Sequence, residues 1–200
     1  MDLSILILST STTVNRYLFI EPIKTTYDLR NIIFIGGIHG SGKGTICEAL
    51  KKQIDIIHLT ASEVLKWNEL STQQEKFVKN ISATQNRLIT NLNKIVQNNK
   101  TYLLDGHYCL LNKDGVPEKI SIHTFEDIKP TKLILVTAKP QIIKERLKNR
   151  DAKTYSIKLI NEFQNLEINY AKEISKNLEI PILVINNNEF KIENLLFFLK

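Results

Sequence analysis

The sequence predicts an α/β fold in three layers, with helices on both faces of a five-stranded parallel sheet. Short apolar runs rich in Ile, Leu and Val alternate along the chain with segments whose apolar residues recur at helical spacing. Strands that alternate with helices in this way form parallel sheets covered on both faces. The chain has 200 residues, of which 42% are hydrophobic and 24% charged, which is enough for one such domain with a substantial core.

The segment from Gly37 to Thr45, G-I-H-G-S-G-K-G-T, is the feature around which the chain is organised. It follows the apolar run 31–36, which predicts a buried strand, and it precedes a helix expected at 46–53. Two glycines that flank four residues and are followed by Lys43 predict a phosphate-binding P-loop (Walker A motif) in this strand-to-helix context. Its backbone N–H groups and the helix N-terminus would bind phosphate oxygens, and Lys43 would reach the outer phosphates. The alternative, a glycine-rich turn that binds nothing, leaves the lysine unexplained.

Downstream of this loop the predicted elements continue the alternation. A second strand is expected at 54–59, followed by a short helix at 60–67. Ser71 and Gln74 form a capping box for a long helix that ends at Asn98-Asn99. The remaining elements are expected in the order strand 101–105, loop 107–120, a short helix around 125, strand 132–136, helices 140–150 and 156–178, strand 181–185 and helix 190–199.

Residues 1–30 precede the first predicted strand, and no function is assigned to them. The apolar cluster 3–8 is too short to span a bilayer and lacks the positive start of a signal peptide. We therefore expect an N-terminal extension at 1–30 and one P-loop domain at 31–200. The two cysteines, Cys47 and Cys109, form no ligand pattern, so we expect buried thiols in a reducing, cytoplasmic compartment.

The net charge of +6 raises the question of a nucleic-acid partner. The basic residues are scattered, without a basic run or interleaved aromatic residues, and this argues against nucleic acid. Several phosphates in one active site also require cations. We therefore expect a small-molecule partner and no membrane partner.

Asp105 ends the apolar strand 101–105, and ligands of open α/β sheets bind at the carboxyl ends of the strands. A carboxylate at this place could orient water molecules bound to Mg²⁺ beside the outer phosphates of a nucleotide. Gly106 would allow a substrate to approach the backbone, and His107 could contact that substrate. The alternatives are an ordinary turn aspartate before a glycine and a histidine with a structural hydrogen bond.

Arg146 and Arg150 lie four residues apart on the helix expected at 140–150 and therefore share one of its faces. Ile143 and Leu147 share another face. Two cations on one face could clamp a transferring phosphoryl group, because charge spreads over its oxygens in the transition state. The alternative is a solvated face.

Four motifs, taken in order, resemble adenylate-kinase-like nucleoside monophosphate kinases, and the archaeal type of adenylate kinase is closest in pattern. They are the P-loop with Gly44 directly after Lys43, T-A-S-E-V-L-K at 60–66, L-D-G-H at 104–107 and R-L-K-N-R at 146–150. The resemblance covers about residues 31–199. It implies the P-loop NTPase fold with strand order 2-3-1-4-5, counted along the chain. It also implies ATP and Mg²⁺ as cofactors, with the metal held mainly through water molecules.

The residues and the resemblance together give individual positions an expected role. Catalytic roles fall to Lys43, Asp105, Arg146 and Arg150, and the metal would be held through water by Thr45 and Asp105. The phosphates would be bound by Gly37, His39, Gly40, Ser41, Gly42, Lys43, Gly44 and Thr45. The acceptor would contact Thr60, Lys66, Arg87, Gly106 and His107.

Two departures from the family pattern concern the acceptor. Lys66 stands where the family usually binds the acceptor phosphate with an arginine, and a lysine lacks the planar bidentate fork. The family's Asp-Gly-Phe-Pro-Arg run is replaced by D-G-H-Y-C at 105–109, so the arginine of that run is missing. Arg87 is the candidate to replace it, with a surface charge as the alternative.

These observations predict an ATP-dependent phosphotransferase of the adenylate-kinase type. It would move the γ-phosphoryl group to an AMP-like nucleoside monophosphate or a related small acceptor. Two alternatives stay open: a kinase of the same fold for a non-nucleotide molecule, and a P-loop ATP-binding or ATPase protein with a regulatory or defence role. ADP formation that depends on an acceptor would favour a kinase.

Overall fold

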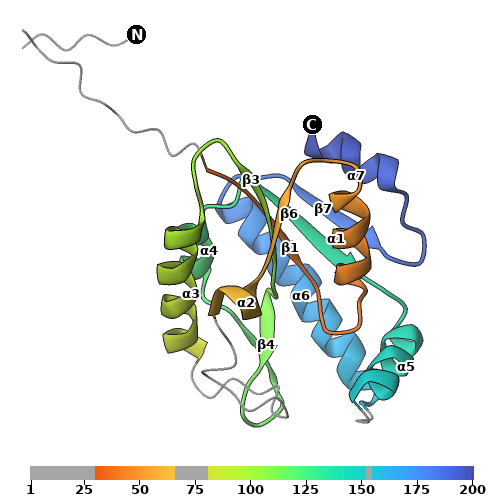
Figure 1. Ribbon diagram of the computed structural model, residues 1–200. Helices are drawn as coiled ribbons and strands as arrows, with labels where there is room; N and C mark the ends of the chain where they lie inside the picture. The colour runs from red at the N-terminus through yellow and green to blue at the C-terminus, as the bar shows by residue number, and fades with distance from the viewer. Residues whose placement is uncertain (1–29, 66–80, 152–154) are drawn as a thin grey trace, which may run out of the picture.

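Five parallel strands form the central sheet of the computed structural model, in the order β2-β3-β1-β6-β7 (Figure 1). The structure describes residues 30–65, 81–151 and 155–200. The strands run over Asn31–Gly36 (β1), Ile57–Thr60 (β2), Thr101–Asp105 (β3), Lys132–Thr137 (β6) and Ile182–Asn186 (β7). Counted along the chain these are the first to fifth strands of the sheet, so the predicted order 2-3-1-4-5 is confirmed.

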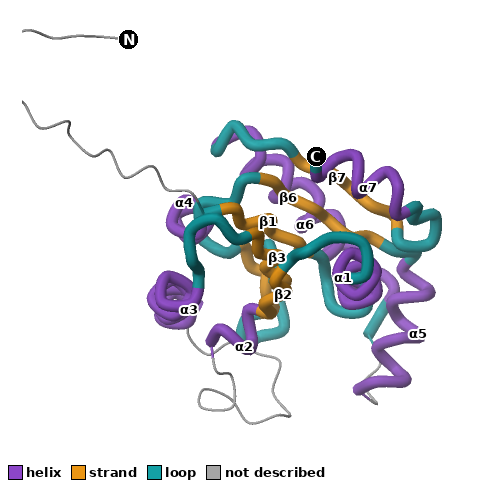
Figure 2. The backbone as a smooth tube through the Cα atoms, turned by 45° about the horizontal axis from the view of Figure 1, so that its top comes forward, coloured by secondary structure: helices purple, strands orange, loops and turns teal. Residues whose placement is uncertain are grey.

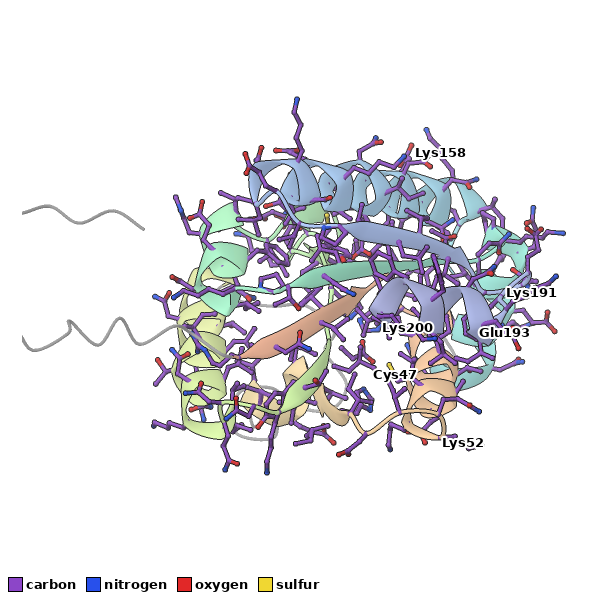
Figure 3. The ribbon with its side chains drawn as sticks, turned by 90° about the horizontal axis from the view of Figure 1, so that it is seen from above. Cys47, Lys52, Lys158, Lys191, Glu193 and Lys200 are labelled. Atoms are coloured by element: carbon purple, nitrogen blue, oxygen red, sulfur yellow. The ribbon has the colours of Figure 1, made fainter. Side chains whose placement is uncertain are left out.

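Helices cover both faces of this sheet, as predicted. α1 and α7 pack on one face, and α3, α4 and α6 pack on the other; Figure 3 shows α6 across the strands from α1 and α7. In Figure 2 the strands run through the middle of the molecule, with α3 and α4 on one side of the view and α1 on the other. The helices span Lys43–Lys51 (α1), Ala61–Leu65 (α2), Ile81–Ile95 (α3), Ile122–Ile128 (α4), Pro140–Asp151 (α5), Ile157–Asn177 (α6) and Ile192–Leu199 (α7).

The alternation of side chains in β1 explains the two layers of the core. Ile32 and Phe34 point toward α3, α4 and α6, whereas Ile33 and Ile35 point toward α1 and α7. All four side chains are buried, with at most 3% of the residue exposed. A strand that is buried on both faces needs apolar residues at every position, and for this reason β1 reads in the sequence as an unbroken apolar run.

The second strand begins later than predicted. The sequence pattern places it at 54–59, whereas β2 begins at Ile57. The Ile54 N–H donates to the Leu50 carbonyl at the end of α1, and Ile56 is buried in the core between α1 and the sheet. Ile54 and Ile56 contribute their side chains to the core, but their backbone lies outside β2. An apolar run in the sequence does not distinguish such core residues from a strand.

The segment 107–120, predicted as a loop, contains a short antiparallel hairpin. β4 (Cys109–Leu111) pairs with β5 (Pro117–Lys119). A turn at 112–115 joins them, and Asn112 Oδ1 accepts two backbone hydrogen bonds of 3.0 Å there. Strands of three residues carry too little alternation to be identified from the sequence.

The C-terminal helices agree with the prediction. α5, α6 and α7 begin and end within two residues of the expected bounds, and Ser156 Oγ caps α6 by accepting from the Leu159 N–H at 3.1 Å. Residues 1–29, Trp67 and the predicted capping box of Ser71 and Gln74 lie outside the described residues. Within the described part of the chain, no helix combines the length and apolar character needed to cross a membrane.

Candidate active site

The P-loop connects β1 to α1 and requires glycine at two of its turns. Gly37 and Gly42 have φ angles of 149° and 98°, in the region that favours glycine. A side chain at Gly37 would collide with the Val136 carbonyl oxygen, and one at Gly42 would collide with the Asn187 side chain. Gly42 is also the N-cap of α1 and makes no side-chain cap. The first-turn N–H groups can therefore serve an anion such as a phosphate.

Lys43, the first residue of α1, folds back over this loop. Its Nζ donates to the Gly37 carbonyl oxygen at 2.8 Å and lies 3.9 Å from Asp105 Oδ1. Burial lowers the pKa of Lys43, and Asp105 opposes this effect. The two atoms that Lys43 Nζ faces are both oxygens. Phosphate oxygens can therefore replace them without changing the kind of contact that the ammonium makes.

Asp105 ends β3 at the sheet edge where ligands of α/β folds bind. The strand register places it beside Ile35 of β1 and Thr60 of β2. Burial raises the pKa of Asp105, and Lys43 opposes this effect as well. On the side away from Lys43, its Oδ2 lies 3.9 Å from His58 Nε2. The carboxyl group thus stands between a lysine and a histidine.

His107 links the end of β3 to the P-loop. Its ring lies 4.3 Å from the ring of His39, centroid to centroid, at an interplanar angle of 55°. Burial, reinforced by the nearby Lys43 charge, holds the pKa of His107 well below its usual value, so the ring is neutral at pH 7. The predicted substrate-binding residue therefore also contacts the loop predicted to bind phosphate.

Glu167 of α6 is a buried acid that the sequence analysis did not identify. Its Oε1 accepts hydrogen bonds from the Tyr108 and Cys109 N–H groups, each 3.1 Å long, and lies 3.9 Å from His107 Nδ1. Burial raises the pKa of Glu167 to about 7. One sequence signal could have found it, because it occupies the apolar stripe of α6 together with Ile160, Phe163, Tyr170 and Ile174.

Arg146 and Arg150 approach the P-loop from α5. Arg146 Nη1 donates to the Gly40 carbonyl oxygen at 3.0 Å. Ile143 and Leu147, on the neighbouring face, are 0% and 5% exposed, as their predicted spacing requires. These two apolar residues fix the helix against the core, and the arginine face is thereby directed to the loop.

One cavity of about 740 Å³ joins these groups. Its first end is lined by the P-loop, Asp105 and the two arginines of α5. Its second end, here named the apolar chamber, is lined mainly by Phe34, Leu65, Leu88, Leu110, Phe125 and Ile128. Thr84, Gln85 and Thr124 add polar groups to this chamber. A cavity of this size and character is typical of sites that enclose small organic ligands.

Most of the predicted site residues line this cavity. They are His39, Gly40, Gly42, Lys43, Gly44, Thr45, Thr60, Asp105, Gly106, His107, Arg146 and Arg150. Gly37 contributes its carbonyl oxygen to Lys43, and Ser41 is fully buried beneath the loop, so neither lines the cavity. Arg87 belongs to α3 but is not part of the lining, and Lys66 lies outside the described residues.

The Thr60 side chain forms a local helix cap. Its Oγ1 accepts from the Glu63 N–H at 3.1 Å and donates to Glu63 Oε2 at 2.8 Å. Glu63 Oε2 in turn accepts from the Thr60 N–H at 3.1 Å, which completes a capping box for α2. Thr60 therefore caps α2 and also lines the cavity.

Thr45 and Asp105 fit a magnesium ion by the chemistry of their donors. A hydroxyl and a carboxylate are hard oxygen ligands, and both residues line the same cavity. Mg²⁺ retains several of its waters when it binds to proteins, and it often shares the remaining positions with substrate phosphates. Thr45 and Asp105 lie beside the P-loop and can supply the few protein ligands that such a magnesium ion needs.

Comparisons with known proteins agree with this geometry. The family described as an AAA domain (AAA_17) matches residues 36–164, more than half of the chain, and the chain belongs to this family. It is 33% identical over 134 residues to the uridylate kinase of Saccharomyces cerevisiae, covering 62% of this chain and 63% of that protein. It is 28% identical over 121 residues to a Methanocaldococcus jannaschii protein provisionally named an adenylate kinase, covering 60% and 59%.

A third relative is UMP-CMP kinase 2 of Caenorhabditis elegans, 31% identical over 88 residues that cover 39% of this chain and 46% of that protein. The chain thus spans less than two thirds of each of these three relatives. Among solved structures, the Bacillus subtilis YorR protein in complex with phosphorylated GDP shares the fold, with a TM-score of 0.51. That match covers 84% of this chain and 95% of the other, at 18% identity. The chain is therefore a P-loop protein that resembles nucleoside monophosphate kinases, as its motifs predict.

Proposed function

We propose that this chain transfers the γ-phosphoryl group of ATP to a nucleoside monophosphate, with an AMP-like acceptor as the first candidate. The observation that carries the proposal is the single cavity with two different ends. One end has the N–H groups and cations that phosphates need, and the other has the apolar walls that a nucleobase needs. We assign the activity to a domain at 31–200, with 1–30 as an extension.

ATP would place its phosphates on the P-loop, where the α1 N-terminus and Lys43 bind their oxygens. Lys43 would exchange the Gly37 carbonyl oxygen for a phosphate oxygen. Arg146 and Arg150 would close on the transferring group from α5 and neutralise the charge that spreads over its oxygens. Mg²⁺, when bound, would neutralise further phosphate charge, held through water by Thr45 and Asp105.

The acceptor would bind with its phosphate toward the P-loop and its base in the apolar chamber. Its phosphate oxygen would attack the γ-phosphorus while the bond to ADP breaks, so no covalent intermediate with the protein is needed. Phe34 and Phe125 offer aromatic surfaces to the base, and Gln85 offers an amide to its polar edge. Gly106 and His107, which line the same cavity, would contact the sugar or the acceptor phosphate.

The names of the curated relatives define the acceptors to test. Two relatives are named for uridine or cytidine nucleotides and one for adenylate. ADP formation from ATP and Mg²⁺ would be followed with AMP, UMP, CMP and GMP, and without an acceptor. We expect at least one monophosphate to raise the rate by about a hundred-fold or more. The same rate with and without every monophosphate would contradict the proposal and favour an ATPase.

A further inference from the structure

Three side chains lie close together beneath the P-loop. The proposed phosphoryl transfer does not use them as one cluster. They are Cys47 of α1, His58 of β2 and Asp105 of β3. A sulfur, an imidazole nitrogen and a carboxylate oxygen from these residues lie within 4.8 Å of one another. Sulfur, nitrogen and oxygen donors from three separate elements thus surround one point.

The fold explains why they meet. Cys47 lies one helical turn after Lys43, so both side chains leave α1 on the same face, and Cys47 packs against the sheet (Figure 3). His58 is paired with Leu103 in the parallel register, and Leu103 packs in the same core as Cys47. Asp105, two residues after Leu103, points to that same face of the sheet.

The environment of His58 is not explained by packing. Its side chain is 15% exposed, and its Nε2 is buried without a hydrogen-bond partner among the described residues. A buried polar atom without a partner is costly, and such atoms in folded proteins usually bind water or an ion. The nearest carboxyl oxygen, of Asp105, is 3.9 Å away, too far for a hydrogen bond but suited to a shared ion.

We propose that Cys47, His58 and Asp105 form a binding site for Zn²⁺ or a similar borderline-soft divalent cation. One thiolate, one imidazole and one carboxylate are the donor types that such cations take, with a fourth position open to water. Mg²⁺ prefers oxygen ligands, so the thiol selects against it. The metal–sulfur bond forms as the Cys47 thiol releases its proton to solvent. The ligand atoms need to approach to roughly 2.0–2.3 Å from the metal, which requires small side-chain movements.

The position of the proposed metal site predicts how a bound cation would affect phosphoryl transfer. Asp105 Oδ1 lies 3.9 Å from Lys43 Nζ, so a bound dication would occupy the carboxyl group and repel the ammonium. Zn²⁺ would therefore inhibit Mg²⁺-dependent phosphoryl transfer. This inhibition rests on the proposed function, whereas the binding itself does not.

Cobalt spectroscopy tests the binding directly, because a Co²⁺–thiolate bond gives a charge-transfer absorption in the near ultraviolet. The nucleotide-free protein would be titrated with Co²⁺ and then with Zn²⁺ as competitor. Cys109, the other cysteine in the sequence, is also buried and free, which makes Cys109→Ala the matched control for Cys47→Ala. We expect the band in the wild type and in Cys109→Ala, its loss in Cys47→Ala, and its removal by Zn²⁺.

Two further variants sharpen the test. His58→Ala should weaken Co²⁺ binding by about ten-fold or more, whereas the exposed His123→Ala should leave it unchanged. Cys47→Ser preserves the size of the side chain and should also lose the band, in case Cys47→Ala does not fold. The absence of a thiolate band in the folded wild type, or its persistence in folded Cys47→Ala or Cys47→Ser, would overturn the proposal.

The inhibition by Zn²⁺ is measured in a separate activity experiment. If monophosphate-dependent activity is found, micromolar Zn²⁺ should reduce it in the wild type and spare Cys47→Ala. If no phosphoryl transfer is found but the thiolate band is present, the proposed function fails while the metal site stands.

Discussion

At the scale of single residues, the site depends on the contacts that Lys43 makes. Its ammonium contacts the Gly37 carbonyl at 2.8 Å and stands 3.9 Å from Asp105. Burial lowers the pKa of Lys43 and raises that of Asp105, so each charge is costly and each depends on the other. A phosphate that binds to the loop would bring negative oxygens close to Lys43 and Asp105. Of these two groups, the Lys43 ammonium would be stabilised most by them.

Lys43→Ala should lower turnover by about a hundred-fold or more, because the ammonium binds charge that develops on the phosphoryl oxygens. ATP binding should also weaken, and the fold should be kept. Steady-state kinetics and nucleotide titration would measure both effects, with the exposed Lys52→Ala at the end of the same helix as the control. Wild-type turnover by a folded Lys43→Ala protein would rule out this active site.

Asp105→Asn should retain nucleotide binding and lower turnover on the order of a hundred-fold. The amide keeps the shape of the side chain but loses the charge that, in the proposed function, would orient magnesium-bound water in the transition state. Rates would be measured across a Mg²⁺ titration, with Asp127→Asn on the surface of α4 as the control. An unchanged rate at saturating Mg²⁺ would make Asp105 a turn residue only.

Arg146→Ala and Arg150→Ala should each reduce turnover by on the order of ten- to a hundred-fold, with a smaller effect on ATP affinity. The reason is that α5 arginines would bind the phosphoryl group most strongly when its charge is spread in the transition state. Lys148→Ala, an exposed cation on the same helix, is the control. If affinity were lost while turnover was kept, the two arginines would be ground-state contacts instead.

At the scale of elements, α6 holds the chain that leaves β3. Glu167 Oε1 accepts the Tyr108 and Cys109 N–H groups, and the Tyr108 hydroxyl donates to the Ile134 carbonyl of β6 at 3.0 Å. These contacts fix the backbone directly after Gly106 and His107. The part of the cavity wall formed by Gly106 and His107 is therefore positioned by a helix that contributes no residue to the lining.

Glu167 should make stability depend on pH. Its pKa is about 7 in the folded protein, against an ordinary value of 4.5, so the folded state binds more protons between these values. The contribution of Glu167 to the free energy of unfolding should therefore fall as pH rises from about 4.5 to about 7, by about 3 kcal/mol.

Glu167→Gln should remove this pH dependence, because an amide can accept the same N–H groups without titrating. Urea unfolding at about pH 5 and about pH 8 would measure it, and Glu162→Gln on the exposed face of α6 is the control. An equal pH dependence in the wild type and in Glu167→Gln would show that Glu167 does not titrate in this range.

The sequence predicts elements well where one local pattern has one structural outcome. The P-loop required glycines at fixed positions, and β1 required an unbroken apolar run, so both could be read directly. The start of β2 could not, because Ile54 and Ile56 serve the core without pairing. The β4–β5 hairpin is too short to produce a pattern. His58 acts through contacts with distant segments, which a single sequence does not encode locally. Glu167 does so as well, and its only local signal is its place in the apolar stripe of α6.

At the scale of the whole molecule, the sheet brings the two ends of the cavity together at the carboxyl ends of its strands. The P-loop follows β1, Asp105 ends β3 and α5 follows β6, so the phosphate end of the cavity is built from neighbouring strands. The apolar chamber is added beside it by α2, α3 and α4. This arrangement places a second ligand within reach of the first, and the proposed transfer depends on that proximity.

The most direct test of this account follows the phosphoryl group itself. ATP labelled in the γ-phosphate would be incubated with the protein, Mg²⁺ and each nucleoside monophosphate, and the labelled products would be separated. We expect label in a nucleoside diphosphate made from one or more acceptors, and no such product with Lys43→Ala. Label that appears only as inorganic phosphate, at a rate that no acceptor changes, would contradict the central claim.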